Sequence, residues 1–182
     1  MVTRVRRLAL AVSLAACGAS GGLPRSPAGV VAESITVTSR SFGPGGAILV
    51  DATCDGGDVS PEVTWSSPPE GTKALVVTLD DLDTQGPDGT RWLLVDVKPD
   101  VRTLKPGVDP AEVAAQLGRN GSGQPGYRGP CPPHRLGHHY SLRVFALDRA
   151  LELPAPPDRD AVNAAMDGHV LGSGELVGTA SR

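Results

Sequence analysis

Three polar clusters in this chain contain residue types that could do chemistry. Residues 80–83 read Asp-Asp-Leu-Asp after an apolar run, and three acids in four residues repel one another unless solvent, a cation or basic side chains face them. Residues 126–133 read Gly-Tyr-Arg-Gly-Pro-Cys-Pro-Pro, a rigid loop whose backbone N–H groups could approach a ligand closely. His138 and Tyr140 fall on one face of the strand that they begin, and His139 falls on the other. Taken alone, the acidic cluster is also consistent with a solvent-exposed turn. His138 alone is also consistent with a hydrogen-bonded histidine in the core.

The apolar runs beside these clusters predict the strands that carry them. Glycine and proline are abundant, at 23 and 17 residues, and both weaken helix interiors, which argues against a helical bundle. Two short helices are predicted, one from Asp109 to about Leu117 and one at 161–167 capped by Asp160. We therefore expect a mainly β fold, an antiparallel β-sandwich with two short helices. Its predicted strands are 35–38, 47–50, 73–79, 92–97 and 140–147.

The surrounding sequence argues against several other kinds of functional site. Residues 121–126 match the dinucleotide pattern GxGxxG, but the sequence that follows cannot open a helix. Cys131 and His134, with the histidines at 138–139, suggest half of a zinc site, but a second cysteine pair is missing, so we expect no metal. We also expect no cofactor and no enzymatic activity, because no activated nucleophile is visible. The net charge of −3 gives no general attraction to nucleic acid, so no nucleic-acid partner is expected.

The first residues of the chain predict a targeting signal. Three arginines precede an apolar run over 8–16, which is too short to span a bilayer and is typical of a signal peptide over residues 1–16. The run ends in Leu-Ala-Ala-Cys-Gly at 14–18, which resembles the lipobox of bacterial lipoproteins, where the cysteine thiol receives a diacylglycerol. The alternative is a simple secretory signal. We expect lipidation at Cys17, a flexible tether over 17–33, a folded domain over 34–182, and a membrane-anchored, extracytoplasmic location in the cell envelope.

Two further cysteines remain once Cys17 is assigned to the lipid. Cys54 and Cys131 would lie in a compartment that permits disulfides, so a bridge between them is one prediction. The other is a pair of small buried thiols, because free cysteine is common in protein cores.

Taken together and in order, the clusters resemble the phosphatidylethanolamine-binding protein family, in its bacterial branch of Raf-kinase-inhibitor-like proteins. The resemblance covers residues 34–182. Its most specific part is the series Gly-Tyr-x-Gly-Pro-Cys-Pro-Pro followed by His-x-Tyr. The other matching segments are 54–65, 71–73, 81–83, 91–92, 145–148 and 165–171, with Gly178 near the end.

The resemblance implies a sandwich of antiparallel sheets with a small anion pocket at one end, which in the family binds phosphate-like groups, including phospholipid headgroups. A histidine, a hydroxyl and loop N–H groups can donate hydrogen bonds to an oxyanion, and an aspartate can orient the histidine. Carried over to this chain, the pocket residues are Asp81, Asp83, Trp92, Gly129, Pro130, His138 and Tyr140.

The sequence departs from the family pattern inside that pocket. The family segment DPDxP reads Asp-Leu-Asp-Thr-Gln at 81–85 without its prolines, and the family pair His-Trp reads Arg91-Trp92. An inward Arg91 would add a permanent charge and a bidentate fork for a phosphate or carboxylate. Alternatively, Arg91 pairs with Asp81 or Asp83 and fills the pocket.

The predicted function is a lipid-anchored, extracytoplasmic binding module for a small anionic or phospholipid-like ligand, with the membrane contacted through the anchor. The alternative is a protein-interaction module that inhibits a protease of the envelope or a secreted protease.

Overall fold

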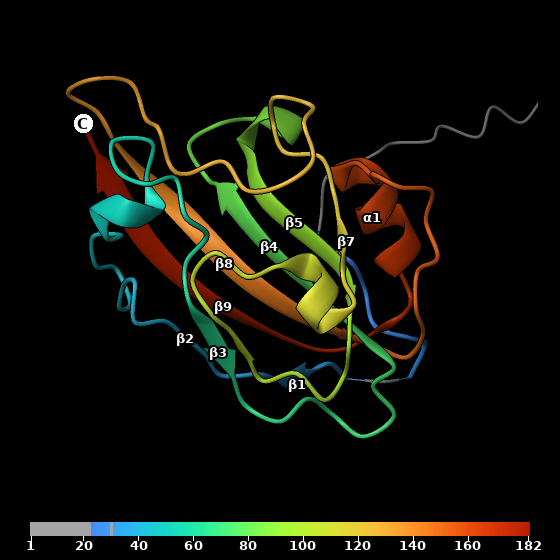
Figure 1. Cartoon of the computed structure of the whole chain (residues 1–182). Coiled ribbons are helices and arrows are strands. Elements are labelled where there is room, and N and C mark those ends of the chain that lie inside the picture. Colours follow the sequence, from blue (N-terminus) through green and yellow to red (C-terminus); the bar gives the residue numbers. More distant parts are fainter. Residues whose placement is uncertain (1–22, 30) are drawn as a thin grey trace, which may run out of the picture.

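The computed structural model describes residues 23–29 and 31–182 (Figure 1). The predicted signal peptide and the lipidation site Cys17 lie outside these residues. Among the residues that are described, no helix has the length and apolar character needed to cross a membrane.

A six-stranded sheet forms the centre of the fold, and its long middle strands are apolar because both of their faces are buried. In β4, the odd-numbered residues Leu75, Val77 and Leu79 join one core cluster, whereas Val76 joins a second cluster on the other face. This explains why the three middle strands are near-continuous apolar runs rather than alternating ones. In spatial order the strands are β1 Glu33–Ser34, β9 Val170–Ser181, β8 Gly137–Leu147, β4 Ala74–Asp81, β5 Thr90–Val97 and β7 Gln116–Leu117.

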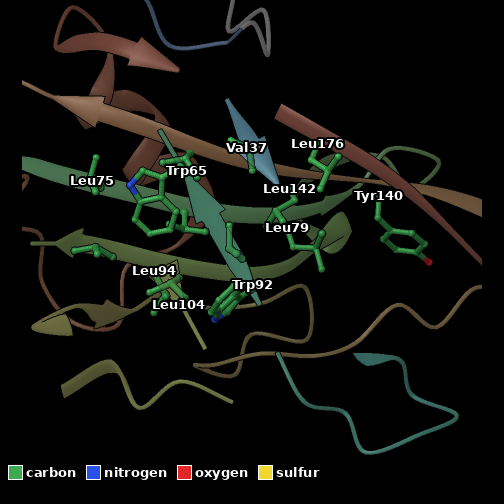
Figure 2. Close-up of a cluster of buried hydrophobic side chains, with 14 of the residues drawn as sticks. Val37, Trp65, Leu75, Leu79, Trp92, Leu94, Leu104, Tyr140, Leu142 and Leu176 are labelled. Atoms are coloured by element: carbon green, nitrogen blue, oxygen red, sulfur yellow. The ribbon is translucent and has the colours of Figure 1, made fainter. Parts of the chain in front are cut away.

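A smaller antiparallel sheet packs on one face of the large one. It consists of β2 Val37–Thr38, β3 Val63–Trp65 and β6 Thr103–Leu104. Its inward side chains, such as Trp65 and Leu104, share one hydrophobic core with Leu79 of the large sheet (Figure 2). On the opposite face, the single α-helix of the described residues, α1 Arg159–Met166, packs Val162 and Met166 against the second cluster.

The prediction of a mainly β fold is confirmed, with differences in detail. The large sheet is mixed rather than purely antiparallel, because β1 runs parallel to β9. The predicted strand at 47–50 is absent: Ala47 forms one isolated bridge to Thr179, and a 3₁₀ helix follows at Val50–Ala52. Of the predicted strand at 35–38, only β2 forms.

Of the two predicted helices, the second forms an α-helix and the first forms a shorter 3₁₀ helix. Asp109 does cap a helical segment, accepting a hydrogen bond from the N–H of Ala111, but that segment is a 3₁₀ helix, Pro110–Val113, and not an α-helix to Leu117. It ends at Ala114, whose φ of 50° is left-handed. The second helix, α1, is capped by Asp158 and not by Asp160, because the extended backbone of Asp158 lets its carboxylate accept from an N–H group of the first turn.

The longest strand, β9, was not predicted from the sequence because glycines interrupt its pattern. These glycines allow neighbouring segments to approach closely. A Cβ at Gly174 would lie 1.9 Å from the carbonyl oxygen of Ile35, and one at Gly178 would lie 2.4 Å from the ring of Phe42. Glycine is therefore required at these two positions by contact and not by backbone angles.

Part of the predicted tether contacts the folded domain. Arg25 bonds to Asp167, just after α1, and β1 contributes Glu33 to the large sheet. The chain is therefore attached to the sheet before residue 34, the predicted start of the domain.

Candidate functional site

The candidate site forms where three neighbouring strands place polar residues at one end of the large sheet. Asp81 is the last residue of β4 and lies opposite Tyr140 of β8 in the antiparallel register. Arg91 follows the first residue of β5, and His138 follows the first residue of β8. We call these four residues the Asp81 cluster.

The carboxylate of Asp81 is fully buried and is the acceptor at the centre of the cluster. Its Oδ2 atom accepts from Nη2 of Arg91 at 2.9 Å and lies 3.0 Å from Nδ1 of His138. Its Oδ1 atom accepts from the backbone N–H of Asp83 at 3.0 Å. Burial alone would raise the pKa of Asp81, but the hydrogen bonds from His138, Arg91 and Asp83 outweigh it and lower that pKa below its ordinary value. Both carboxylate oxygens of Asp81 therefore already accept hydrogen bonds from neighbouring residues.

Arg91 adopts the second of the two arrangements that the sequence left open. Its side chain is 9% exposed and is paired with Asp81 inside the site. Only one terminal nitrogen is engaged in that bond, and Nε is buried without a hydrogen-bond partner. A buried guanidinium therefore retains an unsatisfied N–H donor.

Tyr140 presents a second unpartnered polar atom. Its side chain is completely buried, its ring is stacked on that of His138 with centroids 6.5 Å apart, and its Oη atom has no hydrogen-bond partner. Burial, and then the nearby charge of Asp81, raise the pKa of the Tyr140 hydroxyl far above its ordinary value. The hydroxyl therefore stays protonated and can donate a hydrogen bond.

The glycine-rich loop lies beside the cluster, but the backbone N–H groups of Arg128 and Gly129 are occupied. The N–H of Arg128 donates to the carbonyl of Arg91 at 2.8 Å, which fixes the loop against β5. The N–H of Gly129 donates to the carboxylate of Asp58, and the carbonyl of Pro130 accepts from the N–H of Cys54 at 3.1 Å. Gly129 and Pro130 thus hold the loop on the segment around residue 54, and the N–H of Gly129 is not free to meet a ligand as the sequence suggested.

Two aromatic residues and a disulfide complete this support. The ring of Trp92 meets Tyr127 edge to face, with centroids 5.8 Å apart, and Trp92 itself is buried in the core. The Tyr127 hydroxyl donates to the carbonyl of Ala52. Cys54 and Cys131 form a disulfide that joins the loop to the same segment across 77 residues. Sequence reasoning missed the roles of Tyr127 and Asp58, although both belong to the motif segments.

Asp83 is turned towards His139. Its Oδ2 atom accepts from the backbone N–H of His139 at 2.6 Å and lies 3.0 Å from the Nδ1 atom of that residue. The hydrogen bond from the backbone N–H of His139 is the largest cause that lowers the pKa of Asp83 below its ordinary value. The carboxylate of Asp83 therefore binds His139 at the edge of the site, whereas the backbone N–H of Asp83 donates to Asp81.

The acidic residues could be considered as metal ligands. Asp81, Asp83 and His138 could each offer one ligand atom, and these atoms lie within 4.8 Å of one another. However, the Arg91 guanidinium already occupies the carboxylate of Asp81, and a fixed positive charge at this distance repels a cation. The arrangement is better suited to an anion.

A separate hollow of about 210 Å³ contains none of the predicted site residues. Arg159 lines it and is bound to Asp80, the residue before Asp81, on the α1 side of the sheet. Pro87, Asp88, Arg119, Asn120 and Asp158 are among its other lining residues.

Known proteins share both the sequence and the fold of this chain. The "Putative lipoprotein LppC" of Mycobacterium tuberculosis is 35% identical over 189 residues, which cover 94% of this chain and 92% of the relative. A UPF0098 protein of Methanothermobacter thermautotrophicus is 36% identical over 147 residues, covering 79% of this chain and 97% of the relative.

Solved structures agree with these relatives. A phosphatidylethanolamine-binding protein homologue from Chlamydia trachomatis matches with a TM-score of 0.75 at 31% identity, over 83% of this chain and 99% of its own. Escherichia coli YbcL, described as a member of the mammalian family, matches with a TM-score of 0.72 at 28% identity, over 81% of this chain and 98% of its own. The family model of phosphatidylethanolamine-binding protein matches residues 38–181. The chain therefore belongs to the phosphatidylethanolamine-binding protein family, and its similarity to LppC supports a place in the lipoprotein branch.

Proposed function

We propose that the chain is a binding module for a small oxyanion of the phosphate type, held at the Asp81 cluster. The observation that carries the proposal is the pair of unpartnered buried atoms, Nε of Arg91 and Oη of Tyr140. Nε–H can only donate, and a neutral phenol donates readily, so a matching ligand must accept hydrogen bonds from both. A buried donor without a partner is costly, and an oxyanion would relieve that cost at both atoms.

The charges of the cluster favour a small ligand. Asp81 already balances Arg91, so the positive charge available to an anion comes from the part of the guanidinium that Asp81 leaves unpaired and from His138 when it is protonated. Because the Arg91 side chain lies inside the site, we propose a headgroup-sized phosphate as the ligand and not acyl chains. Inorganic phosphate and phosphoethanolamine are the ligands that fit this chemistry, and the second agrees with the family name.

We propose further that the module works outside the cytoplasm on a lipid anchor at Cys17. The lipobox-like segment at 14–18 supports this location, as does the similarity to LppC, which is named as a lipoprotein. We also propose a sandwich architecture, in which the two sheets share one core and the Asp81 cluster lies at one end of the large sheet.

Isothermal titration with inorganic phosphate and with phosphoethanolamine tests the proposal. We expect binding by the wild type, and weaker binding by the variants His138→Ala and Tyr140→Phe. The matched control is His169→Ala, because His169 pairs with Asp148 at the opposite ends of β8 and β9 and should bind like the wild type. Equal heats of binding for the wild type and both cluster variants would show that the ligand does not bind at the Asp81 cluster.

One observation favours a second candidate function, the inhibition of a protease. The Arg91–Asp81 ion pair lies within the pocket that the family resemblance assigns to an anion. If this pair makes the site structural only, the chain would act through its surface on a protein partner. A protease of the envelope that co-purifies with the wild type and is inhibited by it, in the absence of any phosphate binding, would support this function.

A further inference from the structure

The two ring nitrogens of His138 lie in different surroundings. Nδ1 is 3.1 and 3.0 Å from the two carboxylate oxygens of Asp81, inside the Asp81 cluster. Nε2 makes no hydrogen bond to the described residues, but unlike Nε of Arg91 and Oη of Tyr140 it is not buried. The side chain as a whole is 15% exposed. A ligand that enters the cluster from solvent therefore meets the Nε2 edge of the imidazole.

Asp81 decides which nitrogen of His138 carries the hydrogen. The pKa of Asp81 lies below its ordinary value despite its burial, so the carboxylate is ionised at neutral pH and can only accept hydrogen bonds. The hydrogen between the two side chains therefore belongs to Nδ1. A neutral imidazole with its hydrogen on Nδ1 presents a lone pair at Nε2. The edge that faces the ligand is then a hydrogen-bond acceptor.

The charged groups around His138 do not fix a second proton on the ring. The guanidinium of Arg91, from β5, balances the carboxylate of Asp81, from β4. The carboxylate of Asp83 accepts from the neighbouring histidine at the edge of the site. Tyr140, the next residue on the same face of β8, keeps its phenol proton because its pKa is raised by burial and by the charge of Asp81. The four residues of the cluster thus contain no unpaired carboxylate.

An oxyanion at the cluster therefore meets two donors and one acceptor. Nε of Arg91 and Oη of Tyr140 donate, whereas Nε2 of His138 accepts. Because the ring of Tyr140 is stacked on that of His138, a ligand that accepts from the phenol lies beside the imidazole. An oxygen without a hydrogen would set its lone pair against that of Nε2, and an oxygen that bears a hydrogen would donate to it.

We propose that His138 selects the ligand by its hydrogen, so that the site takes inorganic phosphate as hydrogen phosphate and discriminates against oxyanions that lack a P–O–H group. Sulfate has the same shape and charge as hydrogen phosphate but no hydrogen. Phosphate diesters, the form found in phospholipid headgroups, also have none, and monoesters lose theirs with a pKa of about 6. The inference rests on the proposed function, that is, on oxyanion binding at the Asp81 cluster.

Titration of the full chain with phosphate and with sulfate tests the proposal, because at about pH 8 the two dianions differ chiefly in one hydrogen. In isothermal titration of the wild type at that pH, we expect sulfate to bind at least about tenfold more weakly than phosphate, since it leaves Nε2 facing an oxygen without a hydrogen. Dimethyl phosphate stands for the diester of a lipid headgroup and should behave like sulfate.

The variant His138→Gln separates selectivity from binding. A glutamine amide can donate as well as accept, so this variant should bind phosphate and sulfate with similar affinity. The matched control is His169→Gln, the same substitution in the pair with Asp148 at the opposite ends of β8 and β9. It should keep the preference of the wild type for phosphate.

Nitrogen-15 NMR of histidine-labelled protein tests the position of the hydrogen without any ligand. The signals that disappear in His138→Gln belong to His138, and at about pH 8 we expect them to show a ring protonated at Nδ1 only. A hydrogen on Nε2, whether alone or together with one on Nδ1, would overturn the proposal.

The titrations distinguish failure of this inference from failure of the proposed function. Equal binding of phosphate and sulfate by the wild type, or a preference that persists in His138→Gln, would overturn selection by His138 while oxyanion binding stands. Absence of binding by phosphate, sulfate and dimethyl phosphate alike would overturn the proposed function, and the inference with it.

Discussion

Asp80 and Asp81 are consecutive residues at the end of β4, and each is neutralised by a buried arginine on a different face of the large sheet. Asp80 pairs with Arg159 of α1 at 3.0 Å, whereas Asp81 pairs with Arg91 of β5 at 2.9 Å. The repulsion expected among the acids of residues 80–83 is thus relieved by basic side chains. The end of β4 therefore contacts α1 through Asp80 and the candidate site through Asp81.

Removing the cation from the Asp81 pair should be costly. Arg91→Leu would leave a buried carboxylate without its guanidinium, and we expect the free energy of unfolding to fall by about 3 kcal/mol. The double variant Arg91→Leu with Asp81→Leu should lose less than the sum of the two single variants. Urea denaturation measures all three. Arg40→Leu, which breaks an exposed pair, is the control and should cost less than about 1 kcal/mol. Additive losses would show that the two side chains are not coupled.

The loop position Gly129 should not tolerate a methyl group. A Cβ there would lie 2.7 Å from both the carbonyl oxygen of Ala52 and the carboxylate of Asp58. We expect Gly129→Ala to destabilise the fold by about 2 kcal/mol and to weaken phosphate binding, because the loop must move away from its support. Gly43→Ala has nothing within 4 Å of its new Cβ and serves as the control. Thermal unfolding curves that agree for the two variants would show that the loop has room to adjust.

The disulfide should stabilise the fold mainly by restricting the unfolded chain. Cys54 and Cys131 close a loop of 77 residues, for which chain entropy gives about 4.5 kcal/mol. We expect the double variant Cys54→Ala with Cys131→Ala to lose most of this amount in urea denaturation. Wild type treated with a reductant should behave like the double variant. If reduction left the denaturation midpoint unchanged, the bond would be absent or without effect on stability.

The Asp81 cluster should make stability depend on pH in a defined direction. Because the folded state lowers the pKa of Asp81, the stability that its carboxylate contributes is complete above the ordinary carboxyl pKa of about 4 and is lost as the pH falls through the lower folded value. The comparison is with Asp81→Asn, which cannot titrate. We expect the wild type to be more stable than this variant at pH 7, with a difference that shrinks below about pH 4. A difference that stays constant from pH 7 to pH 3 would contradict the assignment.

Much of the fold could be predicted from the sequence because burial on two faces leaves a strong apolar signal. This signal marks β4, β5 and β8, which carry Asp81, Arg91 and Tyr140. By contrast, the glycines of β9 erase its pattern, although close contacts with other segments require them. The choice of Asp158 over Asp160 as a helix cap depends on one backbone conformation, which residue types alone do not specify.

The residues that come together at the candidate site could be predicted, but the choice among their possible pairings could not. Motif residues indicated Asp81, Arg91 and His138, yet the partner of Arg91 depends on how β4 and β5 lie side by side. The use of the Gly129 N–H by Asp58 depends on a contact across 71 residues, for which no local pattern exists. Likewise, the two unpartnered donors become visible only when all hydrogen bonds around the cluster are accounted for.

A crystal structure of the chain grown with inorganic phosphate tests the central claim most directly. We predict one phosphate whose oxygens accept hydrogen bonds from Nε of Arg91 and from Oη of Tyr140, with the Arg91–Asp81 pair retained. In crystals of Tyr140→Phe grown under the same conditions, this phosphate should be lost or weakly occupied. Phosphate bound only elsewhere on the wild-type surface, with ordered water on both donors, would contradict oxyanion binding at the Asp81 cluster.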